Sequence, residues 1–292
     1  MPLRAPAIVD VDGERVDPDL PYVVDAHVHL FPDGIFRAIW RWFDEHGWPI
    51  RYRLPTPEVI DFLLARGVGR IVALHYAHKP GVARPLNAYM AEVCRTRPRV
   101  TGLATVYPFD DDAPAILEEA FALGLAGVKL HCHVQAFAPD DPRLHAIYET
   151  CERHEKPLVV HAGREPRSDA YPRDPHELCD ADRVARVLAD HPRLDLCVPH
   201  LGADEFDAYT RLLERHDRLW LDTTMMLGDY FDAKPPPRIL SVRPDRILYG
   251  TDFPILPYAW DHELRRIRRH DFDDATLERV LATNARALYR LP

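Results

Sequence analysis

The feature that most constrains the fold of this chain is the alternation of apolar runs with amphipathic segments along its whole length. The apolar runs predict strands at 22–28, 70–75, 100–106, 126–131, 157–161, 194–199, 218–223 and 246–251. The other segments predict helices at 57–65, 86–96, 113–123, 142–154, 181–190, 203–215, 261–269 and 273–288. Strands and helices that alternate in this way indicate βαβ units and a parallel sheet. Eight β-then-α repeats predict a (β/α)₈ TIM barrel, whose catalytic residues come from the carboxyl ends of its strands.

The length of the chain fits a single domain. Its 292 residues are close to the size of one such barrel, about 250 residues, so we expect residues 1–292 to form one unit. Residues 1–21 precede the first strand and predict a small β-hairpin that turns at Asp12-Gly13. The connection at 31–56 is long and aromatic, which is typical of a loop or lid over a binding site.

Charge and cysteine content narrow the functional class. The formal net charge of −9, without a block of basic residues, argues against nucleic acid or an anionic membrane as a partner. No apolar run approaches the roughly 18 residues of a membrane span. The five cysteines are widely spaced and contain no C-x-x-C, which favours free thiols in a reducing compartment. We therefore expect a cytoplasmic protein that acts on a small molecule, and its aromatic residues permit a homodimer.

Residues that commonly bind metals or substrates stand at the ends of several predicted strands. The first strand ends in Asp25-Ala26-His27-Val28-His29. Side chains alternate along a strand, so Asp25, His27 and His29 face the same way, but two histidines alone do not complete a metal site. Later strands end at or beside Lys129, His161, His200 and Asp252. Since the carboxyl ends of barrel strands meet at one face, we expect these side chains to converge.

Together with Gly250-Thr251-Asp252-Phe253-Pro254, this set resembles the amidohydrolase superfamily. It is most similar to the amidohydrolase-related branch that includes aminocarboxymuconate-semialdehyde decarboxylase, and the resemblance extends from Asp25 to about Leu288. The resemblance implies that one divalent ion is bound by His27, His29, His161 and Asp252. Zinc is the first expectation, with manganese or iron as alternatives. The resemblance also implies that His200 positions or activates a metal-bound water.

Such a site supports more than one chemistry. A bound divalent ion lowers the pKa of water to about 7 and polarises a carbonyl, and Asp252 could transfer the proton to the leaving group. The first prediction is therefore a metal-dependent hydrolase of an amide, ester or lactone in a small organic acid. Non-hydrolytic decarboxylation of a small aromatic or unsaturated carboxylate is the alternative, because it uses the same ligands. A metal-binding barrel without catalysis and a metal-free lactonase are further alternatives.

Four more residues are predicted to act near the ion. Lys129 is assigned a catalytic role, for which two forms remain open. The resemblance implies that it could be carboxylated and bridge two ions, as in some amidohydrolases; alternatively it remains an ammonium that binds a substrate carboxylate or oxyanion. His75 ends the second strand, His131 shares the parity of Lys129, and Arg164 lies in the loop after the fifth strand. These last three are candidate substrate-binding residues.

Overall fold

The protein is described by a computed structural model that covers residues 6–270 and 272–292. All eight predicted strands are present and parallel. They are β1 (Val24–His29), β2 (Arg70–Leu74), β3 (Val100–Gly102), β4 (Val128–His131), β5 (Leu158–His161), β6 (Leu196–Val198), β7 (Leu219–Asp222) and β8 (Ile247–Leu248). The strands differ from the predictions at their ends: β3 ends at Gly102 rather than at residue 106 and β8 at Leu248 rather than at residue 251, whereas β1, β4 and β5 begin one or two residues later than predicted.

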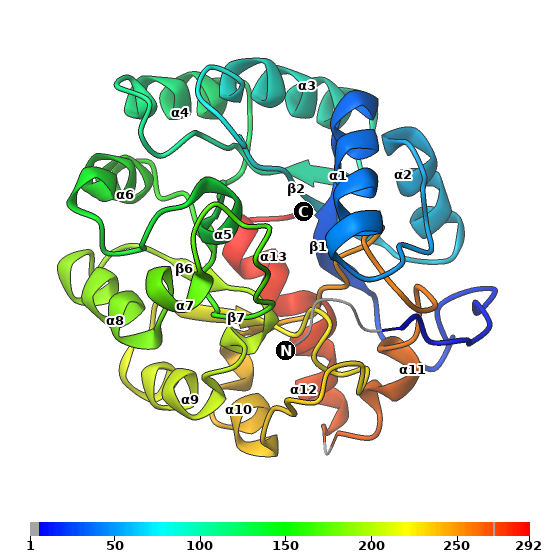
Figure 1. Ribbon diagram of the computed structural model, residues 1–292. Coiled ribbons are helices and arrows are strands. Elements are labelled where there is room, and N and C mark those ends of the chain that lie inside the picture. The colour runs from blue at the N-terminus through cyan, green and yellow to red at the C-terminus, as the bar shows by residue number, and fades with distance from the viewer. Residues whose placement is uncertain (1–5, 271) are drawn as a thin grey trace.

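The strands close into a barrel. Hydrogen bonding joins β1-β2-β3 into one sheet and β4 to β8 into another, each in chain order. Parallel bridges join the two sheets at both seams, between Val28 and Phe253 and between Ala104 and Val128. At the second seam the Lys129 N–H donates to the Ala104 carbonyl at 2.8 Å. The helices form a ring around the strands (Figure 1), and the predicted TIM barrel is confirmed.

The helices lie between the strands as the sequence pattern indicates. They are α1 (Asp33–His46), α2 (Thr56–Ala65), α3 (Ala83–Thr96), α4 (Ala113–Ala122), α5 (Cys132–Gln135), α6 (His145–Arg153), α7 (Pro175–Leu178), α8 (Ala181–Asp190), α9 (Phe206–Arg215), α10 (Pro237–Ser241), α11 (Leu264–Ile267), α12 (Asp274–Glu278) and α13 (Asn284–Tyr289). Single 3₁₀ turns occur at Pro142–Leu144, His200–Gly202 and Pro244–Arg246, and a π-helical turn at Arg279–Thr283 joins α12 to α13.

Helix α8 shows why these segments become helices. The Asp180 carboxylate accepts the Arg183 N–H at 2.7 Å and caps the first turn. Val184, Val187 and Leu188 recur at helical spacing and are buried against the barrel. The helix therefore has the bounds that the sequence predicts, 181–190. Within the described residues, no helix is both long and apolar enough to cross a membrane.

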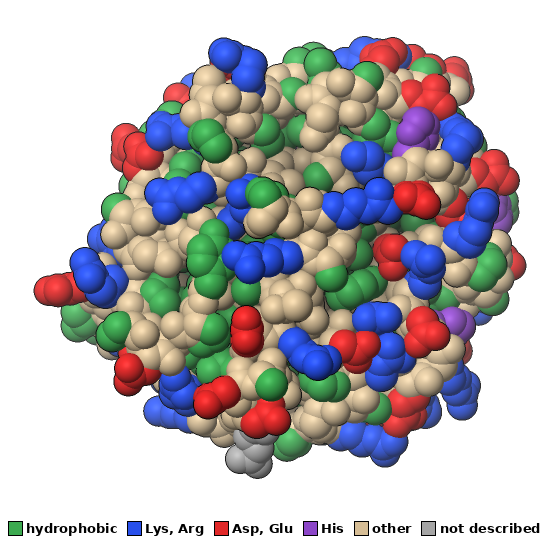
Figure 2. Space-filling model, turned by 180° about the vertical axis from the view of Figure 1, so that it is seen from behind, with side chains coloured by type: hydrophobic (Ala, Val, Ile, Leu, Met, Phe, Trp, Pro, Cys, Tyr) green, Lys and Arg blue, Asp and Glu red, His purple; other side chains and the backbone are tan. Residues whose placement is uncertain are grey.

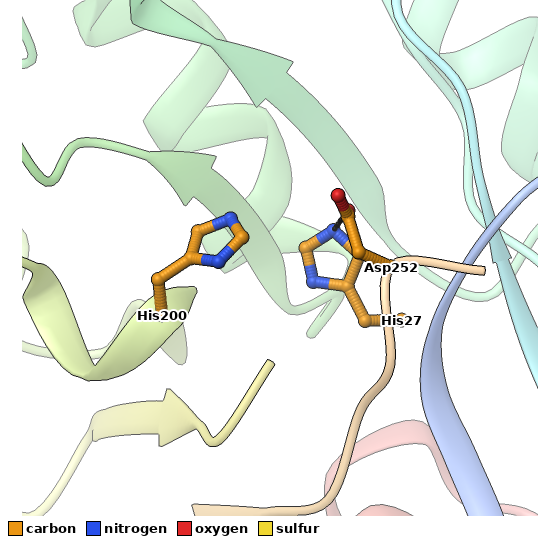
Figure 3. A group of neighbouring side chains, drawn as sticks. All are labelled: His27, His200 and Asp252. Carbon is orange, nitrogen blue, oxygen red and sulfur yellow. Dashed lines mark ion pairs between the residues drawn. The ribbon is translucent and has the colours of Figure 1, made fainter. Parts of the chain in front are cut away.

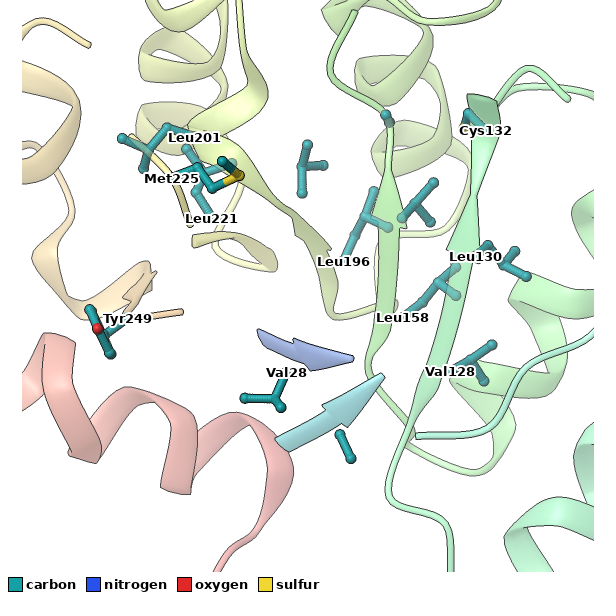
Figure 4. Close-up of a cluster of buried hydrophobic side chains, with 14 of the residues drawn as sticks. Val28, Val128, Leu130, Cys132, Leu158, Leu196, Leu201, Leu221, Met225 and Tyr249 are labelled. Carbon is teal, nitrogen blue, oxygen red and sulfur yellow. The ribbon is translucent and has the colours of Figure 1, made fainter. Parts of the chain in front are cut away.

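Two apolar layers hold the barrel together. One lies between strands and helices and includes Val128 and Leu130 of β4 (Figure 4). The other fills the barrel interior with side chains such as Val159, Cys197 and Leu248, and packs against α13. In Figure 1, α13 lies near the centre of the ring of helices, so the last helix covers one end of the barrel. All five cysteines are free thiols, as predicted.

The N-terminal segment differs from its prediction. Among residues 6–21 the structure forms no strand, so the expected hairpin is replaced by an extended segment that lies against the barrel. The Ile8 N–H donates to the Pro257 carbonyl at 3.0 Å and the Gly13 N–H to Asp261 Oδ1 at 3.1 Å. These backbone groups therefore pair with the region after β8 rather than with each other.

The segment 31–56 also differs, because most of it is helix α1 rather than a loop. Phe36, Trp40 and Phe43 follow one another at intervals of four and three residues, a spacing that could have indicated this helix. Phe36 is buried, and the ring of Trp40 stacks on it at a centroid distance of 5.7 Å.

Charged side chains of both signs are spread over one face of the molecule. The face seen from behind in Figure 2 has Lys and Arg side chains interspersed with Asp and Glu. Charged side chains of the protein also form ion pairs, for example Arg218 with Asp195 at 2.7 Å and Arg84 with Asp112 at 2.8 Å.

Candidate active site

Three of the predicted residues form a compact group where the strands end. His27 comes from β1, His200 from the turn after β6, and Asp252 from the segment after β8. Each offers a ligand atom, and these atoms lie within 4.8 Å of one another (Figure 3). All three side chains are buried. The strand ends thus bring together residues that are 225 positions apart in the sequence.

His29 and His161 border this group. His29 Nε2 lies 3.0 Å from Asp252 Oδ1, and His27 Nε2 lies 3.3 Å from the same oxygen. The His161 ring is 4.6 Å from the His200 ring, measured between centroids, and stacks on the His131 ring at 4.2 Å. The predicted ligands therefore lie close together, with His200 among them. Their assignment as ligands stays a prediction.

Burial sets the protonation of the site. Desolvation lowers the pKa of His27 to about 4 and lowers the pKa values of His161 and His200 below the ordinary value of 6.5. Burial alone would raise the pKa of Asp252, but its hydrogen bond with His29 and the neighbouring imidazoles lower it. At neutral pH the site therefore holds uncharged imidazoles beside an ionised carboxylate.

These groups fit a divalent ion. Neutral imidazole and carboxylate are the forms in which histidine and aspartate bind first-row metals. His27 Nε2 is buried and has no hydrogen-bond partner, although it lies 3.3 Å from Asp252 Oδ1. Buried polar atoms are rarely left in that state unless water or an ion satisfies them. This unpartnered nitrogen and the carboxylate are thus consistent with a metal site.

Asp222, the last residue of β7, was not predicted from the sequence as a site residue. Its Oδ2 accepts a hydrogen bond from His27 Nδ1 at 2.7 Å, and its side chain is buried. The signal was present, because Asp222 follows the apolar run Leu219-Trp220-Leu221 in the same position as the other site residues. The contact with His27 also depends on the closure of the barrel, which the sequence does not show directly.

Lys129 lies inside the barrel rather than in contact with the solvent. It is fully buried, and its Nζ has no hydrogen-bond partner. Desolvation lowers its pKa to about 8, although the charges of Asp222 and Asp252 act in the opposite direction. It pairs with Val159 in the ladder between β4 and β5. Its predicted catalytic role, as a carboxylated lysine or as an ammonium, stays a prediction.

The three predicted substrate-binding residues have different surroundings. His131 lines the cavity described below. His75 is fully buried and is not among the lining residues, and its Nε2 lies 3.2 Å from Asn87 Oδ1. Arg164 pairs with Asp204 at 3.0 Å and does not belong to the cavity wall. Sequence position alone could not reveal these partners of His75 and Arg164, because neither partner is adjacent to them in the chain.

A cavity of about 640 Å³ opens above the site. Its base includes His29, His131, His161, His200 and Asp252. One wall comes from α1 and the residues that follow it and contains Ile35, Ile39, Trp42, Phe43 and Trp48. Trp42 stacks on Tyr171, another lining residue, at a centroid distance of 5.3 Å. The segment expected to form a lid thus supplies a largely apolar wall, and the cavity has the size and character of a small-molecule site.

Comparisons with known proteins agree with this architecture. A model of the family described as Amidohydrolase matches residues 24–291. A search of curated proteins finds no significant match. Among solved structures, 5-carboxyvanillate decarboxylase from Sphingomonas paucimobilis shares 19% identity with a TM-score of 0.68, covering 93% of this chain and 99% of that chain.

Two further solved structures are similar. The 5-carboxyvanillate decarboxylase of Novosphingobium aromaticivorans, complexed with manganese and 4-hydroxy-3-methoxy-5-nitrobenzoic acid, shares 18% identity with a TM-score of 0.65, covering 96% of this chain and 99% of that chain. The 2,6-dihydroxybenzoate decarboxylase from Rhizobium shares 18% identity with a TM-score of 0.61, covering 93% and 99%. At these identities the likeness shows the fold alone.

Proposed function

The chain belongs to the amidohydrolase family, and we propose that it is a metal-dependent decarboxylase of small aromatic carboxylates. The observation that carries this proposal is the cavity. Its walls are largely apolar and aromatic, and its buried base places imidazoles beside the Asp252 carboxylate. Such a cavity suits a flat ring whose polar group is directed toward the base.

The wall of the cavity supports an aromatic substrate. Trp42, Phe43 and Trp48 present aromatic surface from one side, and Tyr76 and Tyr171 contribute two further rings. Aromatic side chains bind rings by offset stacking and edge-to-face contact as well as by burial of apolar area. A volume of about 640 Å³ accommodates a substituted benzene ring with space for substituents.

The base of the cavity would hold the metal. His27, His29, His161 and Asp252 are the proposed ligands, and His200 lies close enough to Asp252 and His27 to take part. A bound divalent ion would supply a Lewis acid that holds and orients an anionic group of the substrate. The manganese in the relative from Novosphingobium aromaticivorans supports manganese as a candidate beside zinc.

Decarboxylation requires a proton at the ring carbon that loses the carboxylate. The bond between that carbon and the carboxylate carbon breaks, its electron pair remains with the ring, and carbon dioxide leaves. Asp252 is ionised and His200 is uncharged at neutral pH, so one of them would first take a proton from solvent water and then release it to this carbon. A substrate ring packed against the apolar wall would displace water from the base, which would strengthen electrostatic interactions there.

Hydrolysis, the first prediction from the sequence, would use the same side chains. The decarboxylase activities named for the similar structures support the alternative instead. The two chemistries differ in their products, because only decarboxylation releases carbon dioxide and leaves a hydrogen on the ring.

The test uses purified protein with Mn²⁺ or Zn²⁺ and two panels of compounds, hydroxylated benzoates and simple lactones and esters. Reactions run in D₂O and are followed by carbon dioxide release and by mass spectrometry of the products. We expect one carbon dioxide per arene formed, with one deuterium at the vacated carbon, and loss of this activity in Asp252→Asn. Acid formed from a lactone or ester, with no carbon dioxide from any benzoate, would instead establish hydrolysis.

A further inference from the structure

We propose that Asp222 is the positioning residue of this site, a single carboxylate that orients both His27 and His200 so that each directs an unprotonated Nε2 toward Asp252. The inference rests on the proposed metal-dependent function. Asp222 is almost fully buried and does not line the cavity, so it acts through the two histidines rather than on the substrate.

The contact with His27 fixes the tautomer of that ring. A carboxylate accepts hydrogen bonds, so Asp222 Oδ2, at 2.7 Å, requires the proton of His27 to be on Nδ1. His27 Nε2 is then the unprotonated nitrogen, and it lies 3.3 Å from Asp252 Oδ1. In metal sites, a second hydrogen bond of this kind to a ligating histidine fixes its orientation and raises its basicity.

The other oxygen of Asp222 holds the backbone that carries His200. Asp222 Oδ1 accepts the His200 N–H at 3.0 Å. His200 has φ of 58° and Leu201 has φ of 53°, a left-handed conformation that is costly for residues other than glycine. Such a conformation persists only where its surroundings hold it, and the hydrogen bond to Asp222 is one of the interactions that do so.

The same oxygen also sets the tautomer of His200, through Thr224. Asp222 Oδ1 accepts the Thr224 N–H at 3.2 Å, and the Thr224 carbonyl lies 3.0 Å from His200 Nδ1. Because a carbonyl only accepts, the proton of His200 is on Nδ1 and its Nε2 is unprotonated. One carboxylate therefore links the ring of His27, the backbone of His200 and the loop that orients the His200 ring.

The Asp222→Asn substitution tests this arrangement, because an amide offers one acceptor oxygen where the carboxylate offers two. If the amide nitrogen faces His27, the His27 proton moves to Nε2. If the amide oxygen faces His27, the His200 N–H loses its acceptor. In either orientation we expect the affinity for Mn²⁺ to fall about 10-fold to 100-fold in competition with a chelator. We also expect kcat at saturating Mn²⁺ to fall more than KM changes.

The control variant is Asp195→Asn. Asp195 accepts a hydrogen bond from Trp220 Nε1 at 3.1 Å and pairs with Arg218, away from the histidines. This substitution removes a carboxylate that contacts β7, the strand that ends at Asp222. Because Asp195 does not contact the histidines, we expect Mn²⁺ affinity to be unchanged.

A second measurement needs no variant and no metal. ¹⁵N NMR of metal-free wild-type protein labelled at histidine reports which ring nitrogen carries the proton. We expect His27 and His200, assigned from His27→Gln and His200→Gln spectra, both to be protonated at Nδ1. Protonation of either ring at Nε2 would overturn the inference even if Asp222→Asn failed to fold.

The outcomes separate this inference from the proposed function. Reduced Mn²⁺ affinity in Asp222→Asn together with the predicted tautomers supports the inference, even if the wild-type protein releases no carbon dioxide from any benzoate. Conversely, a wild-type protein that decarboxylates, beside an Asp222→Asn variant with unchanged Mn²⁺ affinity and kcat, would overturn the role of Asp222 and leave the proposed function intact.

Discussion

The two ends of the barrel interior are lined by side chains of different character, although the same strands supply both. Toward α13 the interior is filled by apolar side chains such as Leu103 and Leu248, and their burial stabilises the fold by roughly 25 cal/mol per Å². At the carboxyl ends of the strands the side chains are also buried, but they are polar. Two of their nitrogen atoms, His27 Nε2 and Lys129 Nζ, lack hydrogen-bond partners. Burying such groups costs free energy. One end therefore provides stability, and the other retains costly groups because they serve the site.

The largest effect should follow from a change at the polar end. Asp252→Asn removes the carboxylate charge beside His27 and His29, so we expect decarboxylation to fall roughly 10³-fold. The free energy of unfolding of the metal-free protein should change by less than about 1 kcal/mol, since no apolar contact is lost. Carbon dioxide release and urea unfolding measure the two quantities. Activity within 10-fold of wild type, together with a large loss of stability, would show instead that Asp252 stabilises the fold and is not needed for activity.

The apolar end should respond in the opposite way. Leu103 is fully buried in the interior cluster, so Leu103→Ala should lower the free energy of unfolding by about 2–5 kcal/mol. The protein that remains folded should keep its metal content. Leu103→Met is the matched control, with an expected loss below about 1.5 kcal/mol. An alanine variant as stable as wild type but unable to bind metal would show that the two ends are not separable.

A smaller, pH-dependent effect should arise from His75. Burial lowers its pKa from 6.5 to about 4, so below pH 6.5 the unfolded chain binds a proton that the folded protein excludes. This stability is present above about pH 6.5 and is lost as the pH falls, up to about 3 kcal/mol near pH 4. Urea unfolding of metal-free wild type and His75→Gln at pH 7.5 and 4.5 measures it. The variant should lose less stability between the two values, and identical losses would refute this role.

The smallest effect should come from the outer part of the cavity, where Lys79 is an exposed lining residue. Because an exposed cation contributes at most about 1 kcal/mol to binding an anion, Lys79→Gln should raise KM for a benzoate a few-fold and leave kcat unchanged. Lys234→Gln, at an exposed pair with Asp229, is the control. An unchanged KM would mean that Lys79 does not contact the substrate.

The sequence was most informative where the chemistry is local. The proximity of His27 and Asp252 was predictable because each follows an apolar run, and the ends of barrel strands converge. Asp222 follows the same pattern, but its importance lies in contacts with His27 and the His200 backbone that form only when the barrel closes. Arg164 was predicted to bind substrate because it lies in the loop after the fifth strand, and that role stays a prediction; in the structure it pairs with Asp204 and is not a lining residue of the cavity. What distinguishes Asp222 from Arg164 is which residues each contacts in the folded protein, and residue type alone does not show those contacts.

The barrel was predicted correctly, but the prediction was wrong for two segments outside its strands, the N-terminal segment and residues 31–56. The alternation of strands and helices repeats along the chain and determines the barrel. The N-terminal segment has a hairpin-like sequence, but its backbone finds partners beside Pro257 and Asp261 instead. The segment 31–56 was interpreted as a loop or lid because it is long and aromatic, although the aromatic residues within α1 follow helical spacing.

The most direct test of the account is the metal content of each chain, measured by elemental analysis on protein purified without chelator, with His27→Ala beside it. The account predicts one divalent ion per wild-type chain, lost in the variant, while the variant keeps its fold. A wild-type protein without bound metal, whose activity does not change on addition of manganese or zinc, would contradict it.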